Sequence, residues 1–198
     1  IDCGADIGLV ASAIARQCAN LESIIAYEPN AEAHTLLAHS FRRWSVEARA
    51  INAAVGARRM RGRLTTGISS SAHAQFIVED PEGSVEVRRV DDESIPEGRA
   101  VLLKIDVEGL EFEVASGAVE TLRRAPAFVV MFEAHPRVFE RTGVDPCETI
   151  RLIRSIAPID VSIAERPGVS IDPDAPFFAQ LGAAKGEICN VICAARRN

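Results

Sequence analysis

The sequence predicts an α/β fold: a doubly wound, mainly parallel sheet with helices on both faces. Short apolar runs, which suit buried strands, alternate with longer segments whose apolar residues recur at helical spacing. A turn bounded by Gly4 and Gly8 follows the first apolar run and leads into the first helical segment. This alternation is typical of βα units that feed a parallel sheet.

The first quarter of the chain shows this alternation most regularly. Its predicted elements are a strand ending at Cys3, a helix over about 7–18, a strand over 23–27, a helix to about Trp44 and a strand over 46–52. Asn30 suits the N-cap of the second helix, because its side chain can accept hydrogen bonds from the first-turn N–H groups.

Residues 56–99 interrupt the pattern with glycine, serine, arginine and short alternating stretches, of which 85–90 is the clearest strand. We expect an insertion of short strands and loops there. The main sheet then resumes. Its predicted elements are a central strand over 100–105, a helix over 111–123, a strand over 128–132, a helix over 146–156 and a last strand over 188–193.

We expect one domain over 1–198, because no repeat, linker or low-complexity tract divides the chain. The chain begins with Ile1 rather than Met, only three residues before Gly4. A strand usually has about five residues. We therefore expect that an upstream part is missing from this numbering.

Composition excludes several classes of protein. The net charge of −6 argues against a general nucleic-acid binder. Arg58, Arg59, Arg61 and Arg63 form one local exception, which we interpret as a solvated loop rather than an anion site. No apolar run reaches the roughly 20 residues that span a membrane. The given sequence shows no charged-then-apolar leader, so we do not expect a secreted protein. Five cysteines without a CxxC pair indicate a reducing cytoplasm. The oligomeric state is not determined.

The turn Gly4-Ala5-Asp6-Ile7-Gly8 is the first candidate binding element. Glycines at a strand-to-helix turn let backbone N–H groups approach a ligand closely. The spacing is Gly-x-x-x-Gly, not the Gly-x-Gly-x-x-Gly of a nicotinamide dinucleotide site. It therefore favours a nucleoside ligand without a pyrophosphate. A tight turn with Asp6 as helix N-cap is the plain structural alternative.

Glu28-Pro29 strengthens the prediction of a nucleoside site. Glu28 lies twenty residues after Gly8, at the end of the predicted second strand. In doubly wound sheets, an acidic residue at this place accepts hydrogen bonds from the ribose hydroxyls. An exposed Glu at a strand end is the alternative explanation. The glycine turn and Glu28 together predict ribose binding.

Lys104-Ile105-Asp106-Val107-Glu108-Gly109 follows a central strand, where ligands bind in open α/β sheets. Its three charged side chains alternate with apolar ones and so share one direction if the strand continues. Charges beside a buried strand need partners or a function. A structural pair between Lys104 and Glu108 is one explanation, whereas Asp106 is expected in the active site.

Glu133-Ala134-His135 follows the next strand. His135 has the ordinary pKa of a general base near neutrality, although a single histidine at a strand end is more often structural. Neighbouring strand ends would bring His135 close to Asp106. Asp106, Glu133 and His135 are also a less favoured set of ligands for Mg²⁺ or a transition metal; we expect no metal.

Together these segments resemble the ordered motifs of the FkbM-type methyltransferases, class I enzymes that use S-adenosylmethionine (SAM). The matching segments are Ile-Asp-Cys-Gly-Ala-Asp-Ile-Gly, Tyr-Glu-Pro, Val90-Asp91, Lys-Ile-Asp-Val-Glu-Gly and Phe-Glu-Ala-His. The resemblance runs to about His135. It implies a Rossmann-like seven-stranded sheet with an antiparallel last strand, and O-methylation of a sugar or secondary metabolite.

The resemblance also implies roles for single residues. Those expected to bind the cofactor are Asp2, Gly4, Ala5, Asp6, Gly8, Glu28, Pro29, Asn52 and Asp106, with Asp2, Gly4 and Gly8 at the methionine part. Asp106 and Glu108 would border the transfer site. Asp6 replaces the Asn usual in the family, and an acidic residue for adenine is missing beside Asn52.

The sequence thus predicts a SAM-dependent methyltransferase for a small-molecule hydroxyl. In-line displacement requires alignment of nucleophile, methyl and sulfur, together with a base for the hydroxyl proton. Asp106 and His135 are the candidate bases. Two other classes of protein stay open: a catalytically silent nucleoside-binding or assembly domain, and a nicotinamide oxidoreductase.

Overall fold

A seven-stranded sheet forms the centre of the protein. The computed structural model describes residues 1–66, 75–184 and 186–196. From one edge to the other the strands are β10 (Asp160–Ile163), β11 (Cys189–Arg196), β9 (Ala127–Ala134), β8 (Val101–Ile105), β1 (Asp2–Cys3), β2 (Ser23–Tyr27) and β3 (Glu47–Ile51). Only β11 runs antiparallel to its neighbours, β9 and β10. The predicted seven-stranded sheet with an antiparallel last strand is confirmed.

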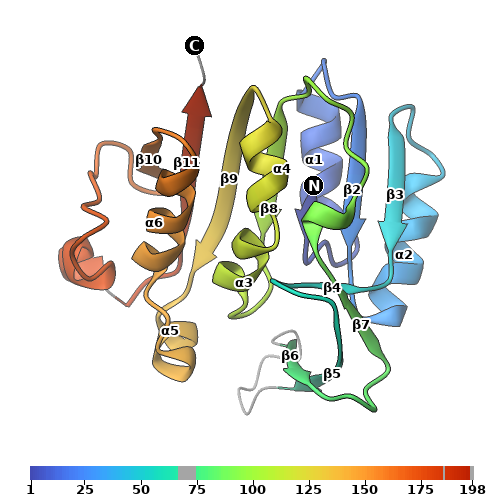
Figure 1. Cartoon of the computed structure of the whole chain (residues 1–198), viewed down its shortest axis with the longest axis horizontal. Helices are drawn as coiled ribbons and strands as arrows, with labels where there is room; N and C mark the ends of the chain where they lie inside the picture. The colour runs from blue at the N-terminus through green and yellow to red at the C-terminus, as the bar shows by residue number, and fades with distance from the viewer. Residues whose placement is uncertain (67–74, 185, 197–198) are drawn as a thin grey trace.

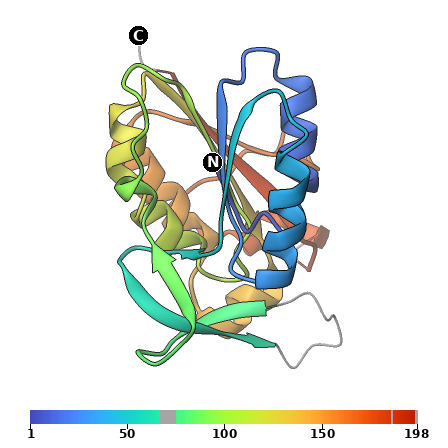
Figure 2. The same ribbon diagram turned by 90° about the vertical axis from the view of Figure 1, so that its right-hand side faces the viewer.

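Helices cover both faces of this sheet (Figures 1 and 2). On one face lie α1 (Leu9–Gln17) and α2 (Ala31–Phe41), and on the other α3 (Glu111–Ser116), α4 (Val119–Arg124) and α6 (Pro146–Ile156). A short helix, α5 (Pro136–Thr142), follows β9 at the lower edge in Figure 1. The architecture is therefore Rossmann-like, as expected.

The core explains why the central strands have so few polar residues. Leu103 and Ile105 of β8 are fully buried, and in β9 the buried residues alternate with partly exposed ones. Phe128, Val130 and Phe132 form that buried row. Burying a side chain of this size stabilises the fold by roughly 1.5–3 kcal/mol. The central strands are therefore a rigid base for the loops at their ends.

The two helices that follow β1 and β2 differ in how they begin. Asn30 caps α2, as predicted: its side chain accepts hydrogen bonds from two first-turn N–H groups. The first helix begins at Leu9 rather than residue 7, with Gly8 as its N-cap. Asp6 is therefore not the cap, because the helix begins only after Gly8, which adopts φ 88°. The second helix ends at Phe41, before Trp44, whose ring packs against that of Phe41.

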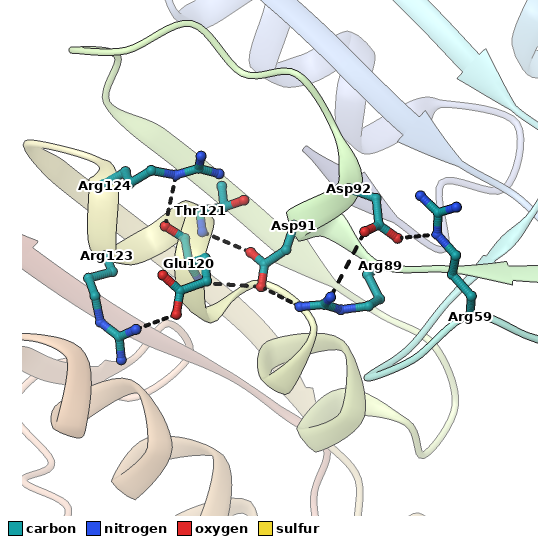
Figure 3. A network of polar contacts seen from close by, with 8 residues as sticks. All are labelled: Arg59, Arg89, Asp91, Asp92, Glu120, Thr121, Arg123 and Arg124. Atoms are coloured by element: carbon teal, nitrogen blue, oxygen red, sulfur yellow. Dashed lines mark hydrogen bonds and ion pairs between the residues drawn. The ribbon is translucent and has the colours of Figure 1, made fainter.

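The helix expected over 111–123 is two helices, with a break at Gly117. A Cβ at Gly117 would lie 2.1 Å from the carbonyl oxygen of Gly56, so the break follows from a close tertiary contact. The N-cap residue of α4 makes no capping hydrogen bond with its side chain, and Asp91 takes that role (Figure 3). The Asp91 carboxylate accepts the Thr121 N–H at 2.8 Å and also contacts Arg89. The Val-Asp motif is thus a helix cap in the structure.

A second sheet lies at the carboxyl ends of the main strands (Figure 1). Its order is β4 (Ala54–Val55), β7 (Val85–Arg88), β5 (Met60–Thr66) and β6 (Gln75–Glu79). The strand expected over 85–90 ends at Arg88, because Val90–Asp92 form a 3-10 turn. Residues 67–74 of the expected insertion lie outside the described part of the chain.

The four arginines of this region are engaged within the protein. Their partners are Glu79 for Arg58, Asp92 for Arg59, the Gly83 carbonyl for Arg61 and Asp80 for Arg63. Exposed pairs of this kind contribute little to stability. Three of the four arginines thus pair with carboxylates and Arg61 with a carbonyl, which favours internal pairing over an open anion site. Part of the cluster lies on the strand β5 rather than on a loop.

Several described elements were not expected from the sequence, among them β4, α5, β10 and the 3-10 segment Phe178–Ala184. The strand β10 has only four residues, so its alternation of polar and apolar residues is a weak signal. All five cysteines are free thiols, and four of them are buried. Among the described residues, no helix is both long and apolar enough to cross a membrane.

Candidate functional site

The turn after β1 has the backbone of a ligand-binding loop. Gly4, Asp6 and Gly8 all have positive φ angles, of 76°, 47° and 88°. The N–H groups of Gly4 and Ala5 both donate to the Tyr27 carbonyl at 3.0 Å. A Cβ at Gly4 would lie 1.8 Å from the carbonyl oxygen of Asp106. Glycine is therefore required there because the ends of β1 and β8 approach each other so closely.

Glu28 joins this turn to the end of β2. Its carboxylate accepts the N–H of Asp6 and the N–H of Asn30, each at 2.8 Å. Burial raises the pKa of Glu28, and these two hydrogen bonds oppose that effect. A carboxylate has about four lone-pair sites, so the side chain keeps the capacity to accept ribose hydroxyls. Glu28 is thus held in place by the backbone and still faces the pocket.

Lys104 is buried beneath the site and does not pair with Glu108. Its ammonium lies 3.1 Å from Asp2 and 3.3 Å from Asp106, and it donates to the Gly4 carbonyl at 2.7 Å. Burial alone would lower its pKa, but the two carboxylates raise the pKa of Lys104 above its usual value. The expected alternative of a Lys104–Glu108 pair is wrong, because the Asp2–Lys104 register of β1 and β8 places Asp2 within reach.

The turn after β8 is strained. Glu108 has φ 56° and Gly109 has φ 110°, two consecutive residues with positive φ. Arg141 of α5 donates a hydrogen bond to the Glu108 carbonyl. Burial and the nearby Asp106 raise the pKa of Glu108, and the Arg141 charge partly offsets this increase. A strained turn that adjacent contacts hold in place is typical of a functional site.

These segments enclose a pocket of about 200 Å³ at the carboxyl ends of β1, β2 and β8. Four acidic residues line it: Asp6, Glu28, Asp106 and Glu108. No lysine or arginine is among its described lining residues. Its other lining residues are Gly4, Tyr27, Pro29, Ala53, Ala54, Val55, Leu64, Ile77, Val107 and Leu110. The pocket is therefore acidic, with apolar walls.

Four of the expected cofactor residues support this pocket without lining it. Asp2 is buried against Lys104, and Ala5 is buried in the core under α1. Gly8 begins α1, where a Cβ would lie 2.7 Å from Leu37. The side-chain amide of Asn52 donates to the Glu28 and Pro29 carbonyls, and so fixes the end of β2. Whether these residues contact a ligand stays a prediction.

His135 lies apart from the acidic pocket. Its Nδ1 accepts the Arg137 N–H at 3.1 Å, so the side chain caps α5. Burial, then Arg137 and Arg141, lower the pKa of His135. Together with Glu133 it lines a different, much smaller cavity. Its catalytic role stays a prediction, and the structure gives it a capping role.

Glu133 has the most perturbed carboxyl of this edge. Burial, followed by Asp106 and two glutamates, raises the pKa of Glu133 to about 7. Among the described residues no group of three His, Cys, Asp or Glu side chains could hold a metal ion, so Asp106, Glu133 and His135 do not form a prearranged metal site.

A larger cavity, about 690 Å³, lies at the opposite end of the sheet. It is lined by residues that begin strands, among them Ser23, Glu47, Val101 and Ala127. Ligands of open α/β sheets bind beyond the carboxyl ends of the strands. The smaller acidic pocket is therefore the candidate functional site.

Comparison with known families shows the family of the chain. Residues 2–157 match the profile of the Methyltransferase FkbM domain. The chain belongs to this family. This FkbM domain covers the acidic pocket completely, since every residue that lines the pocket falls within the matched range. No curated protein matches the sequence.

A search of solved structures matched this FkbM domain to two methyltransferases, of which the first resembles it in fold. The methyltransferase FkbM of Methylobacillus flagellatus KT has a TM-score of 0.55 and 17% identity, covering 96% of this chain and 42% of that one. The plantazolicin methyltransferase BpumL, solved with SAH and a triazolic desmethylPZN analog, has a TM-score of 0.47 and 10% identity, covering 99% of this chain and 76% of that one. The chain thus spans less than half of the FkbM structure.

Sequence reasoning missed the apolar wall of the site. Leu64 of β5 and Ile77 of β6 are directly opposite each other in the second sheet, and both line the pocket. Arg141, which contacts the turn after β8, was also missed. No local signal marks these residues, because they reach the site only through the way the second sheet and α5 pack beneath the main strands.

Proposed function

We propose that this FkbM domain binds SAM and transfers its methyl group to a hydroxyl of a small molecule, a sugar or secondary metabolite. The observation that carries the proposal is the acidic pocket: Asp6, Glu28, Asp106 and Glu108 line it, and its described lining includes no basic residue. Carboxylates suit a ligand with ribose hydroxyls and positive charges. They disfavour the pyrophosphate of a nicotinamide dinucleotide.

The order of the strand ends suggests how the residues share the cofactor. Glu28, at the end of β2, would accept the ribose hydroxyls. The turn from Gly4 lies at the end of β1, and Asp106 and Glu108 follow β8 on its other side. The amino-acid part of the cofactor would therefore extend from Glu28 over the first turn toward Asp106. The bound cofactor supplies a methyl group on a sulfonium leaving group.

The protein's own part in the reaction is alignment and proton acceptance. Asp106 is the favoured base, because its side chain lines the pocket and is 44% exposed. Lys104 lies 3.3 Å from its Oδ2 and would hold the side chain in place. The carboxylate would accept the proton of the acceptor hydroxyl. Glu108 borders the same space and would help to orient the acceptor.

Binding experiments separate the proposed classes of ligand. Isothermal titration with SAM, SAH and NAD should show binding of the first two and none of NAD. Tight NAD binding without a response to either methionine nucleoside would overturn the proposal in favour of an oxidoreductase. Binding of none of the three would remove the nucleoside site altogether.

A turnover experiment separates an enzyme from a silent binding domain. The protein is incubated with SAM and panels of sugars and hydroxylated metabolites, and mass spectrometry follows SAH and products heavier by one methylene. We expect both to form in equal amounts. Cofactor binding without SAH formation across the panels would instead support the silent domain. Dialysis against a chelator, followed by return of Mg²⁺ or Mn²⁺, tests metal dependence, and we expect no change in rate.

A further inference from the structure

Arg141 contacts two segments that border the pocket from different parts of the chain. It lies in the last turn of α5, and its guanidinium donates a hydrogen bond to the Glu108 carbonyl. The same guanidinium lies over the ring of Phe76 in β6, with its carbon 4.4 Å from the ring centroid. This distance is within the range of a cation–π interaction. Arg141 therefore links the turn after β8 to the second sheet.

The turn after β8 needs such a contact. Glu108 has a side chain but adopts φ 56°, a conformation that L residues rarely adopt without support. The next residue, Gly109, packs against the same helix: a Cβ there would lie 2.7 Å from Arg141 Nη2 and 3.2 Å from both Val138 and Thr142. The end of α5 thus covers this turn closely, and the Arg141 guanidinium occupies space that a Cβ at residue 109 would need.

The second contact of Arg141 holds one wall of the pocket. Phe76 precedes Ile77, which lines the pocket opposite the strand ends. The carbonyl of Phe76 also accepts a hydrogen bond from Thr65 of the neighbouring strand. An arginine over this ring therefore orients β5 and β6 as a unit, and with them the pair Leu64 and Ile77.

We propose that Arg141 is a positioning residue of the methyl-transfer site, which fixes the Asp106–Gly109 turn through the Glu108 carbonyl and ties it to the second sheet through Phe76. The proposal rests on the function proposed above. Arg141 does not line the pocket and acts through these two segments. Loss of the Arg141 side chain therefore loosens the Asp106–Gly109 turn and leaves the position of Glu28 unchanged.

Two ligands report on the two ends separately. Adenosine carries only the nucleoside part, which Glu28 would hold, whereas SAH adds the amino-acid part that extends toward Asp106. In isothermal titration, Arg141→Ala should weaken SAH binding about tenfold, because the turn after β8 loses the charged hydrogen bond to the Glu108 carbonyl. The affinity for adenosine should change by no more than about twofold. Arg141→Lys keeps a donor for the Glu108 carbonyl and should recover part of the SAH affinity.

Arg137→Ala is the matched control, since it removes the same charge from the same helix at an exposed position outside the pocket. It should leave both ligands unaffected. Equal weakening of adenosine and SAH in Arg141→Ala would indicate general disruption and overturn the positioning role. Unchanged SAH affinity in Arg141→Ala, beside normal wild-type binding, would overturn it as well.

Amide hydrogen exchange in the ligand-free protein tests the same contacts without any cofactor. Arg141→Ala should speed exchange at Gly109, whose N–H donates to Glu111, and in β6. Phe76→Leu should speed exchange in β6 and leave Gly109 protected. Unchanged exchange at both places would overturn the link. Failure of the wild type to bind SAH would instead overturn the proposed function, whatever the exchange shows.

Discussion

The backbone N–H of Asp6 donates a 2.8 Å hydrogen bond to the carboxylate of Glu28, 22 residues further along the chain. This bond joins the glycine turn after β1 to the acidic residue that ends β2. The two motifs are thus one structural unit, in which the turn holds the carboxylate and the carboxylate holds the turn. Ligand binding and the shape of the turn are expected to depend on each other for this reason.

Glu28→Gln should weaken SAH binding about tenfold or more, because a charged hydrogen bond contributes about 1.5–3 kcal/mol. The amide still accepts one of the two backbone N–H groups, so the domain should stay folded. Isothermal titration measures the affinity and circular dichroism the fold. Glu32→Gln on exposed α2 is the same chemical change away from the pocket and should have no effect. Equal affinity in Glu28→Gln and wild type would leave Glu28 with a structural role only.

Gly4→Ala should destabilise the protein far more than Gly98→Ala. The two glycines have nearly equal φ angles, 76° and 75°, so an added Cβ brings the same backbone strain of about 1–2 kcal/mol. Only at Gly4 does the Cβ meet a backbone atom, 1.8 Å away, whereas Gly98 has open space. Urea unfolding of both variants measures the difference. Similar losses of stability would show that the ends of β1 and β8 can move apart.

Lys104→Met should destabilise the protein by about 3–5 kcal/mol, because Asp2 then keeps a buried charge without its partner. Adding Asp2→Asn removes that charge and should recover most of the loss. Urea unfolding of the single and double variants provides the measurement. A double variant no more stable than Lys104→Met would mean that the ammonium acts mainly through the Gly4 carbonyl.

Asp106→Asn should lose about 10²–10⁴-fold in methyl transfer at saturating SAM, the usual effect of losing a general base. His135→Asn removes the imidazole but keeps a side chain able to cap α5, so its rate should be close to wild type. The assay uses the acceptor found by mass spectrometry. A large loss in His135→Asn and none in Asp106→Asn would make the histidine the base. If both act as one unit, the double variant loses little more than the worse single variant.

Glu133 should make the protein less stable as pH rises. Its folded-state pKa of about 7 lies above the unfolded value of 4.5, so the folded state retains a proton that the unfolded state has released. The contribution of Glu133 to the free energy of unfolding is therefore fully present below pH 4.5 and is lost as the pH rises through about 7. Glu133→Gln should therefore gain stability over wild type progressively across this window. A constant difference between the two proteins from pH 4.5 to 8 would contradict this.

Local signals in the sequence determined much of the fold. The strand Ser23–Tyr27 and the helix Pro146–Ile156 have the predicted bounds. Both have a boundary that side chains define. Asn30 caps α2, which follows the strand, and Asp145 forms a capping box at the start of the helix Pro146–Ile156. The acidic pocket was also predictable in part, because Glu28 and Asp106 follow parallel strands, whose carboxyl ends meet at one edge.

Tertiary structure alone decided the partners of those residues. Lys104 pairs with Asp2 because β1 and β8 align in one particular register, and no local pattern encodes a register between strands a hundred residues apart. Gly117 breaks a helix whose apolar spacing is continuous, because Gly56 approaches it from the second sheet. Arg141 reaches Glu108 for the same reason. The sequence by itself determined which residues end each strand, and packing between distant segments decided which of them meet.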